Sequence, residues 1–266
     1  MKRLAFASIA FCLSLTEPAL AADIPVDLEL VFAVDVSGSV DWEEAALQRR
    51  GYIDALRSEE VVNAIRSGAH GRIAVAYVEW AGTYLQRTVI DWTVLDGADA
   101  IGSFTQTLTD TSIESGPWTS ISAAIQYVVP MFARNEYQGT RRVIDISGDG
   151  PNNQGIPVME ARTIALNAGI TINGLPIVND RRGPGNTRSI KDLDKYYRDC
   201  VIGGTGAFMI VANDFKDFAT AIKRKLIFEI AGLFPAVDPD LVPVQGGDAA
   251  YCMIGERQFR GGGGLY

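Results

Sequence analysis

The chain has 266 residues, of which 47% are hydrophobic and 21% charged, a composition typical of a globular protein and not of a disordered one. Its formal net charge of −8 disfavours a nucleic-acid backbone or an anionic membrane as the main partner, because both attract basic surfaces. The length suits one large α/β domain with, at most, a small appendage.

The first residues predict export. A basic pair, Lys2 and Arg3, precedes an apolar stretch and the small residues of Ala-Leu-Ala at positions 19–21. This order is typical of a secretory signal peptide, which we place at residues 1–21. The apolar stretch is well short of the roughly 20 residues that span a bilayer, so a membrane anchor is the weaker interpretation. We therefore expect a mature protein in the periplasm or outside the cell, without a membrane span.

Two cysteines, Cys200 and Cys252, remain after such a cleavage. In an oxidising compartment two thiols often pair, so a Cys200–Cys252 disulfide is expected, and two separate buried thiols are the alternative. The chain has a single histidine, His70, far from any pair of cysteines, and this argues against a zinc site.

The first half of the chain alternates between strand and helix patterns. Residues 28–34 are an almost continuous apolar run, as expected of a strand buried on both faces of a parallel sheet. Residues 42–57 have helical periodicity, and residues 72–80 and 84–92 have strand character. The short link between those two strands predicts a hairpin, which would place one antiparallel strand at the edge of the sheet.

The same alternation continues to residue 231. Helices are predicted at 98–109, 120–133, 157–168, 189–197 and 215–231, and strands at 141–147, 170–177 and 207–212. Such an alternation is typical of a doubly wound α/β domain, with a mostly parallel central sheet and helices on both faces. We place this domain at residues 22–233. Residues 234–266 form a Gly/Pro-rich tail, either a short clasp tied by Cys252 or a flexible end.

Polar side chains are concentrated where predicted strands end or helices begin, which is where ligands bind in an open α/β sheet. Asp35, Ser37 and Ser39 follow the first strand, Thr119 precedes a helix, and Asp149 follows the strand at 141–147. Oxygen ligands of mixed charge suit a hard cation, so we expect Mg²⁺ there, with Mn²⁺ or Ca²⁺ also compatible.

The D-x-S-x-S sequence from Asp35 to Ser39, after a buried strand, resembles the metal-ion-dependent adhesion site (MIDAS) of von Willebrand factor A (VWA) domains. Thr119 and Asp149 match the remaining positions of that pattern. The resemblance covers roughly residues 26–232 and implies a Rossmann-like VWA fold. More narrowly, the segments RRVIDISGDGPNNQG and GGTGAF resemble a bacterial exported family with this fold and no assigned function. In VWA domains the two serines and the threonine coordinate the ion, the aspartates bind it directly or through water, and a free position takes a partner's Asp or Glu.

Alternatives remain at several of these positions. VWA domains commonly have Thr-Asp-Gly where this chain has Gly-Asp-Gly at 148–150, and Asp145 of the same strand competes with Asp149 for the last role. Three hydroxyl side chains compete with Thr119, namely Thr111, Ser115 and Ser120. Without a metal, the Asp35–Ser39 turn would be an ordinary helix cap.

The favoured interpretation is an exported binding module that holds a partner protein's carboxylate through a divalent cation. The rival is a metal-dependent hydrolase or phosphatase of the extracytoplasmic space, because an open coordination position also serves catalysis. No histidine, lysine or cysteine nucleophile accompanies the three clusters, and neither a Walker loop nor a G-x-S-x-G motif is present. No catalytic constellation is therefore predicted.

Overall fold

The computed structural model describes residues 23–178, 190–232 and 248–261. Its strands are β1 Ile24–Val26, β2 Glu29–Asp35, β3 Ile73–Trp80, β4 Gln86–Leu95, β5 Tyr137–Gly139, β6 Arg142–Gly148 and β7 Thr171–Pro176. Its helices are α1 Trp42–Arg57, α2 Glu59–Arg66, α3 Ala98–Asp110, α4 Ile121–Val128, η1 Val129–Ala133, α5 Val158–Asn167, α6 Leu193–Tyr196, η3 Tyr197–Val201, α7 Phe218–Ala231, α8 Ala249–Cys252 and α9 Ile254–Gly261. The predicted signal peptide lies outside the described residues.

The central sheet has the order β4-β3-β2-β6-β7, in which β3 and β4 are antiparallel and the other neighbours are parallel. The predicted fold class is confirmed, including the hairpin that places the antiparallel strand at the edge. The short strands β1 and β5 pair with each other in a separate parallel sheet, which the sequence analysis did not predict.

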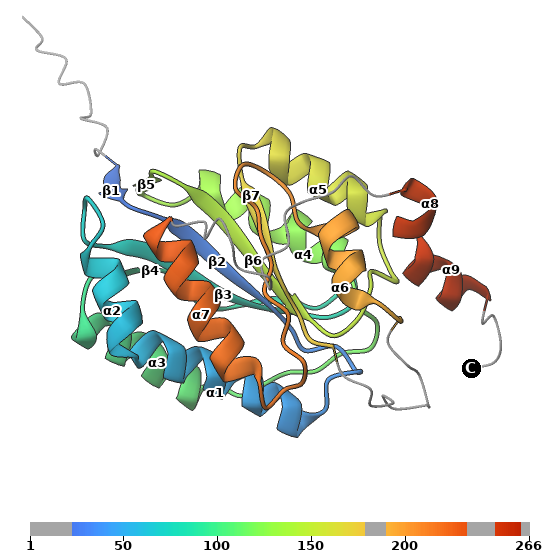
Figure 1. The fold of residues 1–266 in the computed structure, drawn as a ribbon, viewed down its shortest axis with the longest axis horizontal. Helices are drawn as coiled ribbons and strands as arrows, with labels where there is room; N and C mark the ends of the chain where they lie inside the picture. The colour runs from blue at the N-terminus through green and yellow to red at the C-terminus, as the bar shows by residue number, and fades with distance from the viewer. Residues whose placement is uncertain (1–22, 179–189, 233–247, 262–266) are drawn as a thin grey trace, which may run out of the picture.

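Helices cover both faces of the sheet, with α1, α2, α3 and α7 on one side and α4, α5 and α6 on the other (Figure 1). Side chains of β2 alternate between the two cores, since Phe32 packs under α1 and α7 while Ala33 packs under α4 and α5. Every residue of β2 is buried, which explains why residues 30–34 of the strand are all apolar.

The strand predicted at 207–212 is not continuous. The segment runs parallel to β7, but it pairs with that strand only through two isolated bridges, at Met209 and Ala212. Between these bridges the facing residue is Pro176, which has no N–H to donate to the ladder, so the hydrogen-bond pattern is interrupted. The segment therefore extends the sheet by position without forming a sixth full strand.

Two predicted helices are also more divided than expected. The helix predicted at 120–133 changes to a 3₁₀-helix at Val129, directly before Pro130, whose ring does not fit an α-helix interior. The helix predicted at 189–197 begins at Leu193 and continues as a π-helical turn, η3. No helix within the described residues has the length and apolarity needed to cross a bilayer.

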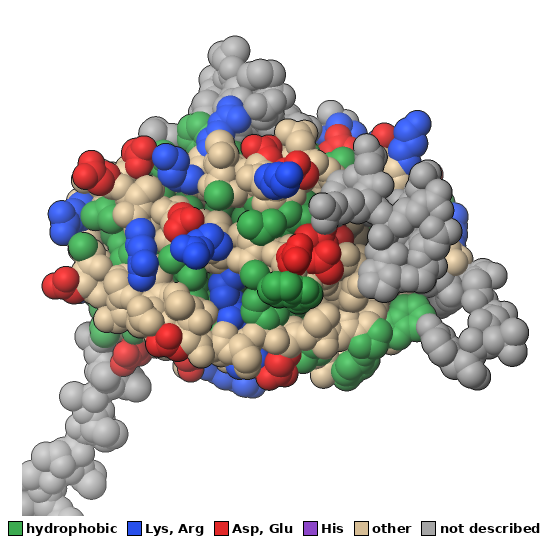
Figure 2. All heavy atoms as spheres, turned by 90° about the horizontal axis from the view of Figure 1, so that it is seen from below, with side chains coloured by type: hydrophobic (Ala, Val, Ile, Leu, Met, Phe, Trp, Pro, Cys, Tyr) green, Lys and Arg blue, Asp and Glu red, His purple; other side chains and the backbone are tan. Residues whose placement is uncertain are grey.

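Acidic and basic side chains are interspersed on the face seen from below in Figure 2. This face does not carry the continuous basic surface that a polyanion requires.

The predicted disulfide forms between Cys200 of η3 and Cys252 of α8, with the two Cα atoms 5.4 Å apart. It ties the C-terminal helices α8 and α9 to the side of the sheet on which α5 and α6 lie (Figure 1). For residues 248–258, the clasp is thus the alternative that the structure adopts.

Removal of this disulfide should destabilise the protein. The bridge closes a separation of 52 residues, and the entropy of closing such a loop in the unfolded chain limits its contribution to about 4 kcal/mol. We expect Cys200→Ser/Cys252→Ser to lower the urea midpoint, by an amount that corresponds to at most about 4 kcal/mol in the free energy of unfolding. A reductant should lower the midpoint of the wild type in the same way and leave that of the double variant unchanged. Equal midpoints for oxidised and reduced wild type would contradict this assignment.

Candidate metal site

The candidate site lies where the winding of the sheet changes direction. Strands β2 and β6 are parallel neighbours, so their carboxyl ends meet at one edge of the sheet. After β2 the chain passes into α1 on one face, and after β6 it passes into α5 on the other. The loops after the two strands therefore diverge, and such a divergence leaves a crevice that binds ligands in open α/β sheets.

The loop after β2 is organised around Asp35, the last residue of the strand. The backbone N–H of Ser37 donates to Asp35 Oδ1 over 2.7 Å, while the Oγ atoms of Ser37 and Ser39 lie 3.1 Å apart. Asp35 is fully buried, and its second oxygen, Oδ2, has no hydrogen-bond partner among the described residues. A buried carboxylate oxygen without a donor is costly unless a ligand satisfies it.

Thr119 and Asp149 reach this loop from two other segments. Thr119 Oγ1 donates to Ser37 Oγ over 3.2 Å, and Ser39 Oγ donates to Asp149 Oδ1 over 2.6 Å. The structure therefore brings together all five residues that the sequence analysis selected. Two carboxylates and three hydroxyls from three loops converge on one place.

The competing residues point elsewhere. Asp145 lies within β6 and forms an ion pair with Lys225 of α7, 2.7 Å away, in the buried layer beneath that helix. Ser120 caps α4 by accepting from the N–H of Ala123, and Thr111 donates to a carbonyl of α3. Ser115 is exposed.

Two asparagines that the sequence analysis did not select hold the site's loops together. Asn153 Oδ1 accepts from the N–H of Thr119 over 2.9 Å, and Asn152 Oδ1 accepts from the N–H of Ser122 over the same distance. Both follow Asp149 on the same loop, so that loop also fixes the start of α4. Their signal in the sequence was the Pro-Asn-Asn run directly after a strand-end Asp-Gly, a pattern typical of turns.

The residue before Thr119 is strained. Trp118 has φ 68°, in the left-handed region that side chains other than glycine rarely adopt. Such a conformation costs roughly 1–2 kcal/mol and persists where neighbouring contacts impose it. Here two backbone N–H groups hold the segment in place, since that of Thr119 donates to Asn153 Oδ1 and that of Ser120 donates to the Ala81 carbonyl.

Among the described residues, no three His, Cys, Asp or Glu side chains lie close enough to hold a metal. The candidate site instead combines two carboxylates with hydroxyls, a donor set for which hard cations are suited.

Comparison with known families assigns the chain to one of them. Residues 25–234 match the family described as "Protein of unknown function (DUF1194)". The chain belongs to this family. No curated protein matches the chain.

Solved structures of low sequence identity share the fold. Proximal thread matrix protein 1 from the mussel byssus, with a zinc-occupied MIDAS motif, superposes with a TM-score of 0.58 and 16% identity over 79% of this chain and 49% of that chain. A von Willebrand factor type A protein from Catenulispora acidiphila has a TM-score of 0.52 and 11% identity over 77% and 43%.

A third similar structure is the pilus adhesin SpaC from Lactobacillus rhamnosus GG, with a TM-score of 0.55 and 12% identity over 78% of this chain and 31% of that chain. The chain spans about half the length of the mussel protein, and less than half the length of the other two proteins. These likenesses, together with the sheet order, confirm the predicted VWA fold.

The two carboxylates of the site oppose each other electrostatically. Burial, and then the nearby charge of Asp149, raise the pKa of Asp35 from its ordinary 3.8 to about 8, against the opposing effect of hydrogen bonds from Ser37. Asp35 is thus held protonated in the metal-free protein, and a bound cation would favour its ionised form instead.

The contribution of Asp35 to the stability of the metal-free protein should therefore decrease as the pH rises. The folded state binds the Asp35 proton more tightly than the unfolded chain does, so this contribution is complete below pH 3.8 and is lost as the pH rises towards about 8. In a chelator, we expect the melting temperature of the wild type to fall across that range and that of Asp35→Asn, which cannot ionise, to fall less. Parallel curves for the two proteins would contradict the assigned pKa.

Proposed function

We propose that this protein is an exported binding module, in which a divalent cation held by Asp35, Ser37, Ser39, Thr119 and Asp149 binds a carboxylate of a partner protein. The observation that carries the proposal is the convergence of these five oxygen-bearing side chains from three loops, at the strand-end crevice of a VWA fold. The unpartnered Oδ2 of Asp35 supports it further.

The donor set fits Mg²⁺ best. Magnesium prefers oxygen ligands and is commonly held by one or two carboxylates, while its remaining positions are filled by other ligands. Asp35 and Asp149 supply the negative charge, and the hydroxyls of Ser37, Ser39 and Thr119 supply neutral oxygens. These residues would fix the position of the cation at the crevice. A cation bound there would hold an incoming carboxylate at a coordination position that the protein leaves open.

The solved structures support protein binding as the purpose of the site. One of them carries zinc in a MIDAS motif, and another is a pilus adhesin. Those properties belong to those proteins, and we extend to this chain only the use of a cation in binding a partner. The disulfide supports a periplasmic or secreted location, since such bonds persist in oxidising compartments.

Aromatic side chains on the loops around the site suit a protein partner. Trp42 follows the Asp35–Ser39 loop and is 77% exposed, Trp118 directly precedes Thr119, and the Tyr84 hydroxyl donates to the Pro117 carbonyl. Exposed tryptophan and tyrosine contribute strongly to protein interfaces because they bury large areas at a low entropic cost. They would contact the residues on either side of the partner's carboxylate.

Metal binding is the first test. We expect the purified protein to bind one Mg²⁺ or Mn²⁺ in a calorimetric titration, and Asp35→Asn to lose binding because it removes a charged oxygen ligand. Glu43→Gln is the matched control, since Glu43 is an exposed acid on the first turn of α1 and is not one of the five proposed ligands. Equal affinities in the wild type and Asp35→Asn would rule out this site, and phosphatase turnover dependent on Asp35 would favour the enzyme.

Partner binding should separate from metal binding at Trp118. In a pull-down from periplasmic extract with Mg²⁺ and again with chelator, a partner should be retained only with Mg²⁺. With that partner, Trp118→Phe should weaken affinity by several-fold while leaving the Mg²⁺ affinity unchanged, because Trp118 is 37% exposed and is not one of the proposed ligands. An unchanged partner affinity would show that the tryptophan lies outside the interface.

A further inference from the structure

Tyr197 lies behind the candidate site, with a hydroxyl that nothing in the fold explains. It is the first residue of η3, its side chain is fully buried, and its Oη has no hydrogen-bond partner among the described residues. Burying a hydroxyl without a partner is unfavourable, and phenylalanine would fill the same space without that cost. The retained oxygen therefore points to a ligand or a charged group that it serves.

The hydroxyl lies near Asp35. A Cβ atom placed on Gly148 would lie 2.8 Å from Tyr197 Oη and 2.8 Å from Asp35 Oδ2, so the two oxygens approach the same small space from different elements. Both are buried, and neither has a partner among the described residues. After burial, the negative charge of Asp35 is the largest cause that raises the pKa of Tyr197, which agrees with their proximity.

The absence of a side chain at position 148 makes this approach possible. A residue larger than glycine there would have to displace Asp35 or Tyr197, because contacts of 2.8 Å are shorter than a Cβ atom tolerates. This is the position at which the sequence departs from the Thr-Asp-Gly pattern of VWA domains. The tyrosine hydroxyl thus occupies space that a side chain at 148 would otherwise take.

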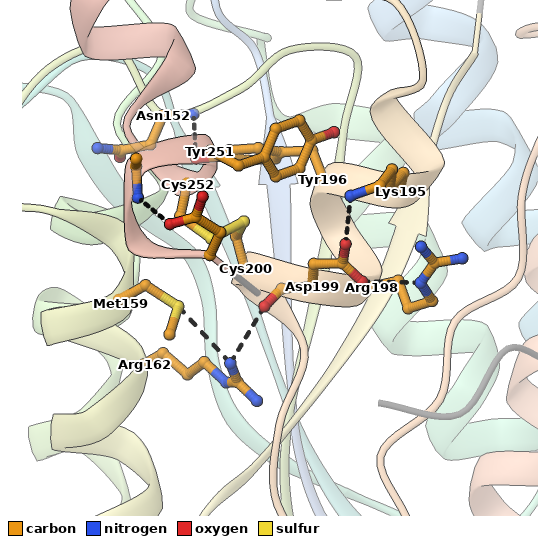
Figure 3. Close-up of a disulfide and its surroundings, with 12 residues drawn as sticks. Asn152, Met159, Arg162, Lys195, Tyr196, Arg198, Asp199, Cys200, Tyr251 and Cys252 are labelled. Carbon is orange, nitrogen blue, oxygen red and sulfur yellow. Dashed lines mark hydrogen bonds and ion pairs between the residues drawn. A yellow bond between two sulfur atoms is a disulfide. The ribbon is translucent and has the colours of Figure 1, made fainter. Parts of the chain in front are cut away.

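The turn that carries Tyr197 is anchored both to the loop after β6 and to the C-terminal helices. The neighbouring Tyr196 Oη accepts from the N–H of Asn152 over 3.2 Å, and Cys200 is joined to Cys252, as Figure 3 shows. Asn152 Nδ2 in turn donates to Glu256 of α9 over 2.8 Å. The turn that carries the Tyr197 ring is therefore fixed by the disulfide at Cys200 and by the hydrogen bond at the neighbouring Tyr196.

We propose that Tyr197 is a positioning residue of the cation site, whose hydroxyl donates a hydrogen bond to Oδ2 of ionised Asp35 and so aims that carboxylate at the cation. The inference rests on the proposed metal site and assigns it one further residue. Partners that hydrogen-bond to a metal-ligating carboxylate orient it, and their loss commonly lowers metal affinity by 10–100-fold.

The test is Tyr197→Phe, which keeps the buried ring and removes only the oxygen. We expect its Mg²⁺ affinity to fall by about tenfold or more in a calorimetric titration. Its melting temperature in a chelator should stay equal to that of the wild type or rise, because an unsatisfied buried hydroxyl is removed. At saturating Mn²⁺, its electron paramagnetic resonance spectrum should also differ, since the Asp35 ligand is oriented differently.

The matched control is Tyr77→Phe. Tyr77 is also fully buried with an unpartnered hydroxyl, but it lies in the other core layer, beside Arg49 and Glu79. Its removal should leave Mg²⁺ affinity unchanged.

A second variant tests whether the free space at position 148 is needed. Gly148→Thr should bind Mg²⁺ less well than the wild type, because its Cβ would lie 2.8 Å from both Asp35 Oδ2 and Tyr197 Oη and would displace one of them. If the wild type binds Mg²⁺ and Tyr197→Phe binds it equally well, the inference is overturned while the metal site stands. If the wild type binds no divalent cation, both are overturned.

Discussion

The close approach of two buried carboxylates, Asp35 and Asp149, is the constraint on which the rest of the site depends. It follows from topology, because β2 and β6 are parallel neighbours whose carboxyl ends coincide. A carboxylate directly after each strand must then share one crevice with the other. Since burial and Asp149 both disfavour ionised Asp35, the arrangement is stable only with a proton or a cation present. The hydroxyls of Ser37, Ser39 and Thr119, from two segments, lie beside this pair and would offer neutral oxygens to the proposed cation.

The buried strand, the doubly wound sheet and the D-x-S-x-S loop could be predicted from the sequence because each has a pattern in the residues that form it. Residues 30–34 of β2 are all apolar because both faces of the strand are buried, and the alternation of strands with helices predicts the doubly wound sheet. The D-x-S-x-S turn identifies one loop, and the order of elements places the other two beside it. The division of the chain into residues 1–21, 22–233 and 234–266 stays a prediction.

Features that depend on distant residues could not be predicted in this way. Asp145 and Asp149 lie on the same stretch of chain, and only the structure shows that Asp145 is paired with Lys225, a residue from α7. Pro176 interrupts the pairing of the segment at 207–212, but its effect depends on a register that no local pattern reveals. Tyr197 reads as an ordinary core aromatic until Gly148 and Asp35 are seen beside it.

The loop after β6 links the site to the C-terminal clasp. Asp149 contacts Ser39, Asn153 holds Thr119, and Asn152 receives contacts from both Tyr196 and Glu256. A loop held by these bonds cannot adjust freely to a ligand, so its oxygens are placed before any ligand binds. Such preorganisation lowers the entropic cost of binding, and it also accounts for the left-handed backbone of Trp118, which only a well-bonded loop sustains. The clasp is thus connected to the site, because the disulfide fixes η3, α6 continues directly into η3, and Tyr196 at the end of α6 bonds to the loop that carries Asp149.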